Sequence, residues 1–187
     1  HFKGRRVISC LGSQELFIQN IRLPQLPAEE LTKVVAWEAD ERLPYPVADA
    51  EIRHLPAGQV KLEANTKQEV ILMACHNGIL ERHLNLLEQA GLNAVAIDVE
   101  PSATLRCFHD GARGAHSNSA NCYLNFGEAA TTVIFADQQN MLFLKYIMQG
   151  SNHLDRAVAD NLDLPLSEAI RMRNIVTNST SLDASDE

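Results

Sequence analysis

The side chains that could carry chemistry in this sequence are scattered and do not form a recognisable catalytic pattern. The candidates for a nucleophile and its base are Ser9, Ser13, His54 and Asp98. Their spacing matches no known nucleophile motif, and no G-x-S-x-G is present. His76 and His83 lie seven positions apart without the further ligands that a zinc site requires. His153 and Asp155 are expected on a helix surface. The sequence therefore predicts neither a catalytic residue nor a metal site.

The four cysteines are also far apart, with no C-x-x-C spacing. Cys10, Cys75 and Cys122 occur in apolar, strand-like runs, whereas Cys107 does not. Free cysteines in such runs behave as small apolar residues and are usually buried. We therefore expect buried thiols in a reducing compartment, and no disulfide framework.

Composition limits the classes of protein to consider. The chain has 187 residues, of which 45% are hydrophobic, so a packed core is expected and global disorder is not. The formal net charge of -8 argues against a nucleic-acid partner, whose phosphates would need Lys and Arg. No apolar run approaches the roughly 20 residues that span a bilayer, and the basic start at 1–6 is not followed by a signal-peptide core.

The first two thirds of the chain alternate between strand and helix patterns. Strands are predicted at 5–10, 15–23, 50–55, 69–75 and 93–99, and helices at 28–42, 78–90 and 101–108. The first helix should begin at Pro27 and end before Pro44 and Pro46. The run 69–75 is apolar throughout, as in a strand that is buried on both faces. Turns are expected at 57–58 and 63–67, and a left-handed helix cap at Gly91.

The last third has a different pattern. The polar stretch 110–118 is predicted to be a flexible boundary. Strands at 121–126, 131–136 and 141–148 should follow, then a helix capped by Ser151 and a short helix at 166–173. Residues 174–187 are polar and are expected to fray. We therefore predict a mixed α/β chain in two parts, which belongs to a longer protein.

One phrase of the sequence is more specific than this order of elements. It runs from Ile21-Arg22-Leu23-Pro24 through Trp37-Glu38-Ala39 to Leu43-Pro44-Tyr45-Pro46. Two further segments, at 88–92 (EQAGL) and 96–100 (AIDVE), are similarly specific. Together they resemble the PilM family, the actin-like proteins of type IV pilus assembly and relatives of the cell-division protein FtsA. The resemblance covers roughly residues 5–173.

The resemblance implies a partial actin-like (ribonuclease H-like) fold with an inserted strand-helix-strand-strand domain. Residues 1–14 would end the first actin-like lobe, and 15–110 would form the inserted small α/β domain. Residues 111–119 would be a linker, and 120–187 would begin the second lobe.

The resemblance also implies a place for nucleotide. In actin-like ATPases the second lobe begins with a hairpin, Asp-x-Gly-x-x-Thr-Thr, whose turn faces the phosphates of ATP bound with Mg²⁺. Gly127, Thr131 and Thr132 match that pattern. Asn125 replaces the Asp, and Glu128 stands where a small residue is usual, so charge disfavours Mg²⁺ and phosphate here. ATP and Mg²⁺ are thus expected, if anywhere, in the full-length protein. The two threonines are equally consistent with ordinary strand formation.

The family's role would be that of a cytoplasmic scaffold at the inner membrane, which grips the N-terminal peptide of a PilN-like membrane partner. The implied docking segment contains Trp37 and Glu38. Tryptophan is more often buried than exposed, so Trp37 can be a core residue or an interface anchor. Glu38 can be a solvated helix residue. An active actin-like ATPase and an FtsA-like self-assembling protein are the alternative functions.

Overall fold

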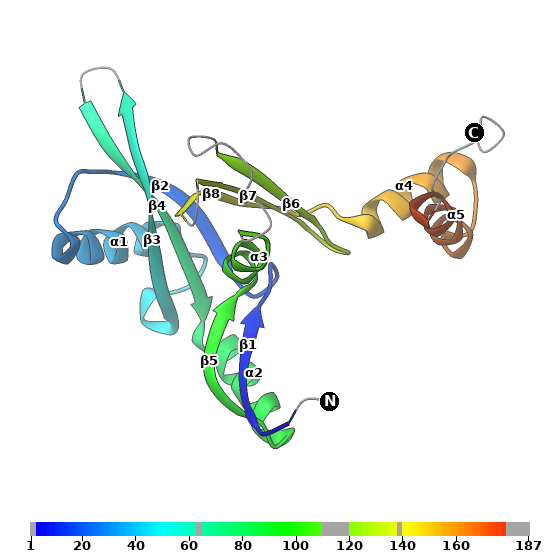
Figure 1. The fold of residues 1–187 in the computed structure, drawn as a ribbon, viewed down its shortest axis with the longest axis horizontal. Coiled ribbons are helices and arrows are strands. Elements are labelled where there is room, and N and C mark those ends of the chain that lie inside the picture. Colours follow the sequence, from blue (N-terminus) through cyan, green and yellow to red (C-terminus); the bar gives the residue numbers. More distant parts are fainter. Residues whose placement is uncertain (1–2, 63–64, 110–119, 138–139, 179–187) are drawn as a thin grey trace. The chain divides into compact units, whose positions relative to one another are not determined.

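The computed structural model describes residues 3–62, 65–109, 120–137 and 140–178 (Figure 1). The first elements in chain order are β1 (Arg6–Leu11), β2 (Phe17–Pro24), α1 (Ala28–Arg42), the short 3-10 helix η1 (Val47–Asp49), β3 (Ala50–Leu62) and β4 (Asn65–His76). They are followed by α2 (Asn77–Gln89), β5 (Asn93–Val99) and α3 (Glu100–His109). The last elements are β6 (Asn121–Phe126), β7 (Thr131–Asp137), β8 (Asn140–Ile147), α4 (Ser151–Leu162) and α5 (Leu166–Asn178).

The strands in the described part of the chain form three small sheets. Strands β1 and β5 pair in parallel. Strands β2, β4 and β3 form an antiparallel sheet in that order, and β6, β7 and β8 form the third sheet. The mixed α/β class and the predicted strand-helix-strand-strand module, β2-α1-β3-β4, are confirmed.

Strand β4 is the centre of the core, as its apolar sequence predicted. Every residue from 70 to 75 is buried. Because side chains alternate along a strand, Val70 and Leu72 face α1, where they pack with Leu31 and Val35. The opposite face packs against the β6–β7–β8 sheet through a cluster that includes Ile71, Met73, Ile134 and Leu144. Strand β4 therefore holds two layers together.

Helix α1 has the predicted bounds because its sequence specifies both ends. Pro27 occupies the N-cap position, directly before the first turn in which it was predicted. Leu43, just before Pro44, has returned to extended backbone. Leu31, Val35 and Ala39, spaced four residues apart, are the buried positions of the helix. Val34 is partly buried against the same core cluster.

The prediction of a turn at Ala57-Gly58 is wrong. Strand β3 continues to Leu62, and its register with β4 shifts between Pro56 and Gly58. Gly58 has φ +111°, so the glycine forms a β-bulge and not a chain reversal. Residues 65–67, also predicted as a turn, belong to β4, whereas 63–64 lie outside the described residues.

Strand β5 pairs with β1, although it follows β4 and α2 in the sequence. Arg6 is opposite Asn93 and Leu11 is opposite Val99, with one irregularity between Val7 and Ile8. The strand-helix-strand pattern at 69–99 therefore does not place its two strands side by side. The predicted domain boundaries at 14, 110 and 119 stay predictions.

The chain divides into two compact units. The first unit comprises His1–Leu124 and Thr132–Tyr146, and the second comprises Asn125–Thr131 and Ile147–Glu187. Two predictions on the second unit are corrected. Gly150, and not Ser151, is the N-cap of α4, and α5 continues to Asn178 instead of ending at Arg173. The predicted flexible boundary at 110–118 lies outside the described residues.

Candidate functional site

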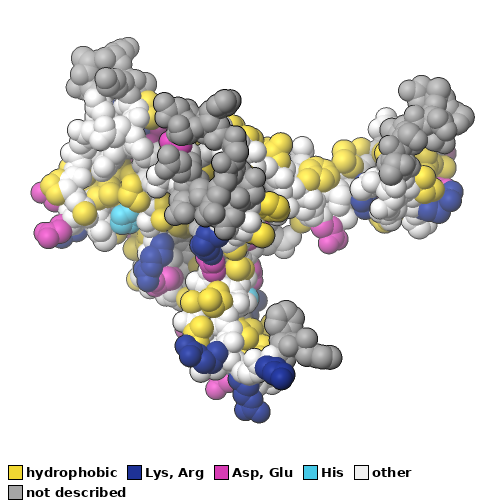
Figure 2. Space-filling model, viewed as in Figure 1, with side chains coloured by type: hydrophobic (Ala, Val, Ile, Leu, Met, Phe, Trp, Pro, Cys, Tyr) yellow, Lys and Arg dark blue, Asp and Glu magenta, His cyan; other side chains and the backbone are white. Residues whose placement is uncertain are grey.

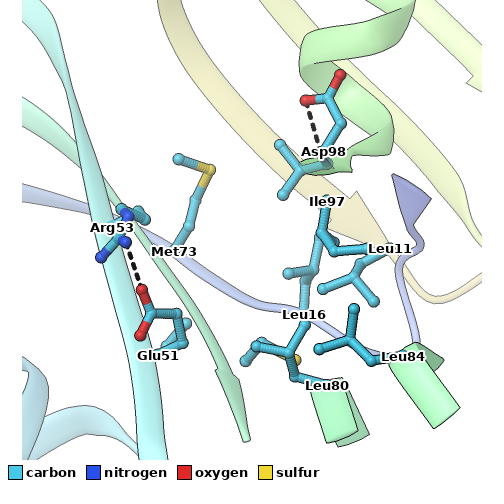
Figure 3. Close-up of a pocket in the computed structure, with 12 residues that line it drawn as sticks. Leu11, Leu16, Glu51, Arg53, Met73, Leu80, Leu84, Ile97 and Asp98 are labelled. Atoms are coloured by element: carbon cyan, nitrogen blue, oxygen red, sulfur yellow. Dashed lines mark hydrogen bonds and ion pairs between the residues drawn. The ribbon is translucent and has the colours of Figure 1, made fainter. Parts of the chain in front are cut away.

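The first unit contains a groove with a largely apolar lining. It has a volume of about 410 Å³. Its lining comes from β1, β3, β4, β5, α2 and the segment before β2: Leu11, Leu16, Glu51, Arg53, Met73, Ala74, Cys75, Leu80, Leu84, Ile97, Asp98 and Val99. We call it the α2 groove. Figure 3 shows the leucines and Ile97 gathered on one side, facing Glu51 and Arg53 of β3 on the other.

Helix and strand periodicity place the apolar wall of this groove. Leu80 and Leu84 are four residues apart on α2, so they point from the same face of the helix. Ile97 and Val99 are two residues apart on β5 and likewise share one face. Leu84 is 38% exposed, and no residue of α2 is buried. Leu80 and Leu84 of this helix thus line an open groove and are only partly packed.

The rim of the groove is charged. Arg53 and Glu51 form an ion pair, with 2.5 Å between Nη2 and Oε1, and both side chains are substantially exposed. Asp98 pairs with Arg106 and accepts a hydrogen bond from the Val99 amide at 2.8 Å. The groove therefore has an apolar wall, and a cation and a carboxylate lie on its rim.

A hydrogen bond that the sequence did not predict supports the groove. Ser9 Oγ on β1 and His83 Nε2 on α2 are 2.8 Å apart. His83 Nδ1 lies 3.9 Å from Glu15 Oε1, and Glu15 also accepts a hydrogen bond from the Gly12 amide. These contacts connect α2, β1 and the turn after β1. This hydrogen bond could not be predicted, because Ser9 and His83 are distant in the sequence.

The residues predicted to contact phosphate are each hydrogen-bonded within the protein. Gly127 donates its amide to Ala130 O, and its own carbonyl accepts from the Ser151 amide at 3.0 Å. The Thr131 hydroxyl donates to Gln149 O at 2.7 Å. The Glu128 carboxylate adds negative charge at this turn. Contact of these residues with phosphate stays a prediction.

The Thr132 side chain points to the carboxylate of Glu100. Thr132 is 3% exposed, and its hydroxyl donates to Glu100 Oε2 at 3.1 Å. Thr104 and Tyr146 also donate to the Glu100 carboxylate, at 3.4 and 3.5 Å. Burial, and then the nearby Glu100 charge, raise the pKa of Tyr146. Sequence reasoning missed Glu100, although a glutamate before Pro101 at the start of a helix was an available signal.

The two predicted docking residues have different surroundings. Trp37 is 61% exposed, so the interpretation of it as a core residue is wrong. Glu38 is paired with Arg42, with 2.6 Å between Oε2 and Nη2. A role of either residue in binding a partner stays a prediction.

Other sequence predictions on reactive side chains were partly wrong. Cys75 is buried, but Cys10 and Cys122 are exposed, because each lies on an open face of its small sheet. Asp155, expected at the surface, is 2% exposed and accepts hydrogen bonds from Arg173 Nε and Nη2 at 2.6 and 3.2 Å. His76 caps α2 by accepting from the Gly78 amide. Within the described residues, no group of three or more potential metal ligands is found.

Comparison with known proteins gives one family and several similar structures. The model of the family "Type IV pilus assembly protein PilM" matches residues 3–178. A chain from the structure of a PilM-PilN type IV pilus biogenesis complex is similar with 21% identity and a TM-score of 0.72. The match covers 90% of this chain and 50% of that one, so the chain spans about half of that relative's length. No protein of the curated set matches.

Two further structures are similar at lower scores. The cytoplasmic domain of EpsL, an inner membrane component of the type II secretion system of Vibrio cholerae, has 11% identity and a TM-score of 0.49, over 83% of this chain and 55% of that one. A Bacteroides thetaiotaomicron protein with an actin-like ATPase fold and unknown function has 13% identity and a TM-score of 0.45, over 88% and 57%.

The fold and the family model agree. The protein is of the α/β, actin-like class with an inserted strand-helix-strand-strand module, as the sequence predicted. It belongs to the family of type IV pilus assembly proteins PilM. No described helix is both long and apolar enough to cross a membrane.

Proposed function

We propose that this chain is the part of a cytoplasmic pilus-assembly scaffold that binds the N-terminal peptide of a PilN-like inner-membrane protein in the α2 groove. The observation that carries the proposal is the open apolar groove, with a volume of about 410 Å³, between two sheets of the first unit. Membership of the PilM family, and the similarity to a chain from a PilM-PilN complex, support the choice of partner. The scaffold would be held at the inner face of the membrane by this contact.

The shape and polarity of the groove suit an extended peptide. Peptide sites combine apolar pockets for alternate side chains with backbone groups of an exposed strand edge. The apolar wall is supplied by Leu80, Leu84 and Ile97. Strand β3 is at the edge of its described sheet, and Glu51 and Arg53 of this strand line the groove. A peptide strand along β3 would place every second side chain toward the leucines.

The charged rim contributes orientation more than affinity. Arg53 and Glu51 are 74% and 46% exposed at their side chains, and exposed ion pairs contribute only about 0–1 kcal/mol. They can still favour one direction of the peptide, because the reverse direction would bring a charge of the same sign next to Arg53 or Glu51, which repels it.

The test is a titration of the chain with a labelled synthetic peptide that has the N-terminal sequence of a PilN-like protein. The variant Leu84→Glu puts a carboxylate into the apolar wall and should weaken binding at least about tenfold, because a buried unpaired charge is costly. Leu86→Glu is the matched control: Leu86 is on the same helix, is 65% exposed and does not line the groove. Equal affinities of the two variants would refute the location, and no binding by the unmodified chain would refute the function.

The alternative functions receive less support. An active ATPase needs phosphates at the turn near Gly127, where the amide and carbonyl groups of this residue are already bonded to the protein. Among the described residues, no particular surface favours FtsA-like self-association. Binding of ATP and Mg²⁺ by the full-length protein stays a prediction.

A further inference from the structure

Helix α1 exposes the only tryptophan of the chain. Trp37 is 61% exposed, whereas tryptophan is usually well buried. Leu31, Val35 and Ala39 face the sheet, so the indole is on the opposite, outer side of the helix. The position therefore exposes a large apolar side chain to water, which a helix with a purely structural role could avoid.

The surroundings of Trp37 are acidic. By helical spacing its neighbours are Lys33, Val34, Asp40 and Glu41, so two of the four are acidic. Helix α1 contains five acidic side chains and two basic ones, a formal charge of -3. Figure 2 shows acidic side chains exposed at the N-terminal end of this helix, where Glu29 and Glu30 lie.

Much of this negative charge is not neutralised by the described protein. Arg42 pairs with Glu38 and lies 4.0 Å from Glu41. Among the described residues, no ion pair is formed by Glu29, Glu30 or Asp40. The outer surface thus combines one large apolar side chain with uncompensated carboxylates.

We propose that the outer face of α1, made of Glu30, Lys33, Trp37, Asp40 and Glu41, docks a second protein partner through a basic, amphipathic segment. The apolar side of that segment would cover the indole, and its Lys and Arg side chains would meet the carboxylates. Tryptophan anchors ringed by complementary charges are typical of interface hot spots. None of the residues that line the α2 groove is on α1, so this surface is separate from the proposed peptide site.

Other occupants fit the charge less well. An anionic membrane surface would be repelled by a helix of charge -3. A second copy of the chain in a two-fold symmetric contact would bring two such helices together, which repel in the same way. A basic protein segment is the occupant that the charge favours.

The probe is a fluorescent amphipathic peptide with a leucine stripe flanked by lysines, compared with the same peptide in which glutamates replace the lysines. The lysine peptide should bind, shift the emission of Trp37 to shorter wavelength, and lose affinity as salt is added. The glutamate peptide should not bind. No binding of the lysine peptide at high micromolar concentration, or equal binding of both peptides, would overturn the proposal.

Variants separate this surface from general charge effects. Trp37→Ala should weaken the lysine peptide at least about 30-fold, as expected for a hot-spot aromatic residue. The double variant Asp40→Lys, Glu41→Lys should weaken it at least about tenfold. The control Glu81→Lys, Glu88→Lys makes the same charge change on exposed positions of α2 and should leave affinity within about twofold.

The folding of the variants can be checked, and two outcomes would overturn the proposal. All three positions on α1 are exposed, so circular dichroism should show native folding of the variants. Equal losses in the α1 and α2 double variants would overturn the proposal, as would concentration-dependent dimerisation that is lost in Trp37→Ala. Leu84→Glu should not affect this binding, so its result tests the α2 groove alone.

Discussion

The contact between Gly150 and the β6–β7 turn gives a sharp test of the second unit. A Cβ atom at Gly150 would lie 2.4 Å from Gly127 O and 2.5 Å from Glu128 O, both backbone atoms. Gly150 has φ -142°, so alanine is disfavoured here by the steric clash and not by the backbone conformation. The clash would also separate the Ser151 and Asn152 amides from the carbonyls of Gly127 and Glu128, which they contact at 3.0 and 3.1 Å.

The expected cost of Gly150→Ala follows from these contacts. Overpacking costs about 1–3 kcal/mol, and each lost hydrogen bond about 0.5–1.5 kcal/mol. With two hydrogen bonds lost, these give a local destabilisation of about 2–6 kcal/mol. The assay is native-state hydrogen exchange, in which the Ser151 and Asn152 amides should lose protection by a factor of about 30 or more.

The matched control is Gly12→Ala, because a Cβ there would meet only Glu15 Oε2 at 3.9 Å, an ordinary contact. Its exchange at Ser151 and Asn152 should equal that of the unmodified chain. Strand β4, in the first unit, should keep its protection in both variants. If Gly150→Ala left the two amides fully protected, the packing of the turn against α4 would be wrong.

Two further predictions concern the first unit. Leu72→Ala removes a side chain with 0% exposure between β4 and α1, so it should lower the free energy of unfolding by about 2–5 kcal/mol. The measurement is urea unfolding followed by circular dichroism. The control is Leu86→Ala, at 65% exposure, and equal effects of the two variants would contradict the described core. The raised pKa of Tyr146 means that its stabilising effect is complete below the unfolded value, about 10, and is lost as pH rises through the folded value. Unfolding at pH 8 and above pH 10 should show this loss in the unmodified chain and a smaller one in Tyr146→Phe; identical pH profiles would contradict the burial of the phenol.

The sequence predicted the elements whose signals are local. Pro27 and Pro44 set the bounds of α1, and the unbroken apolar run in β4 indicated burial on both faces. It failed at β3, since Gly58 can begin a turn or form a bulge, and only the pairing with β4 decides between them. The pairing of β5 with β1 was also beyond local patterns, because the partners are far apart in the chain.

The candidate site was less predictable than the fold. The α2 groove draws residues from six separate segments, none of which has a motif that indicates a groove. Trp37 shows the limit most clearly: its sequence position fixes its place on α1, but whether that face is covered depends on the rest of the molecule. Thr131 and Thr132 are adjacent, yet alternation along β7 sends their hydroxyls to Gln149 and Glu100.

The pairing of β1 with β5 has a consequence for the order in which the chain folds. The whole β2-α1-β3-β4 module and α2 lie between the two strands, so closing that parallel pair from an unfolded chain would lose much loop entropy. A module that has already folded shortens the effective loop, and antiparallel hairpins such as β3–β4 form fast. We therefore expect pulsed hydrogen exchange during refolding to protect β3 and β4 before β1 and β5, and simultaneous protection would rule out this sequence of events.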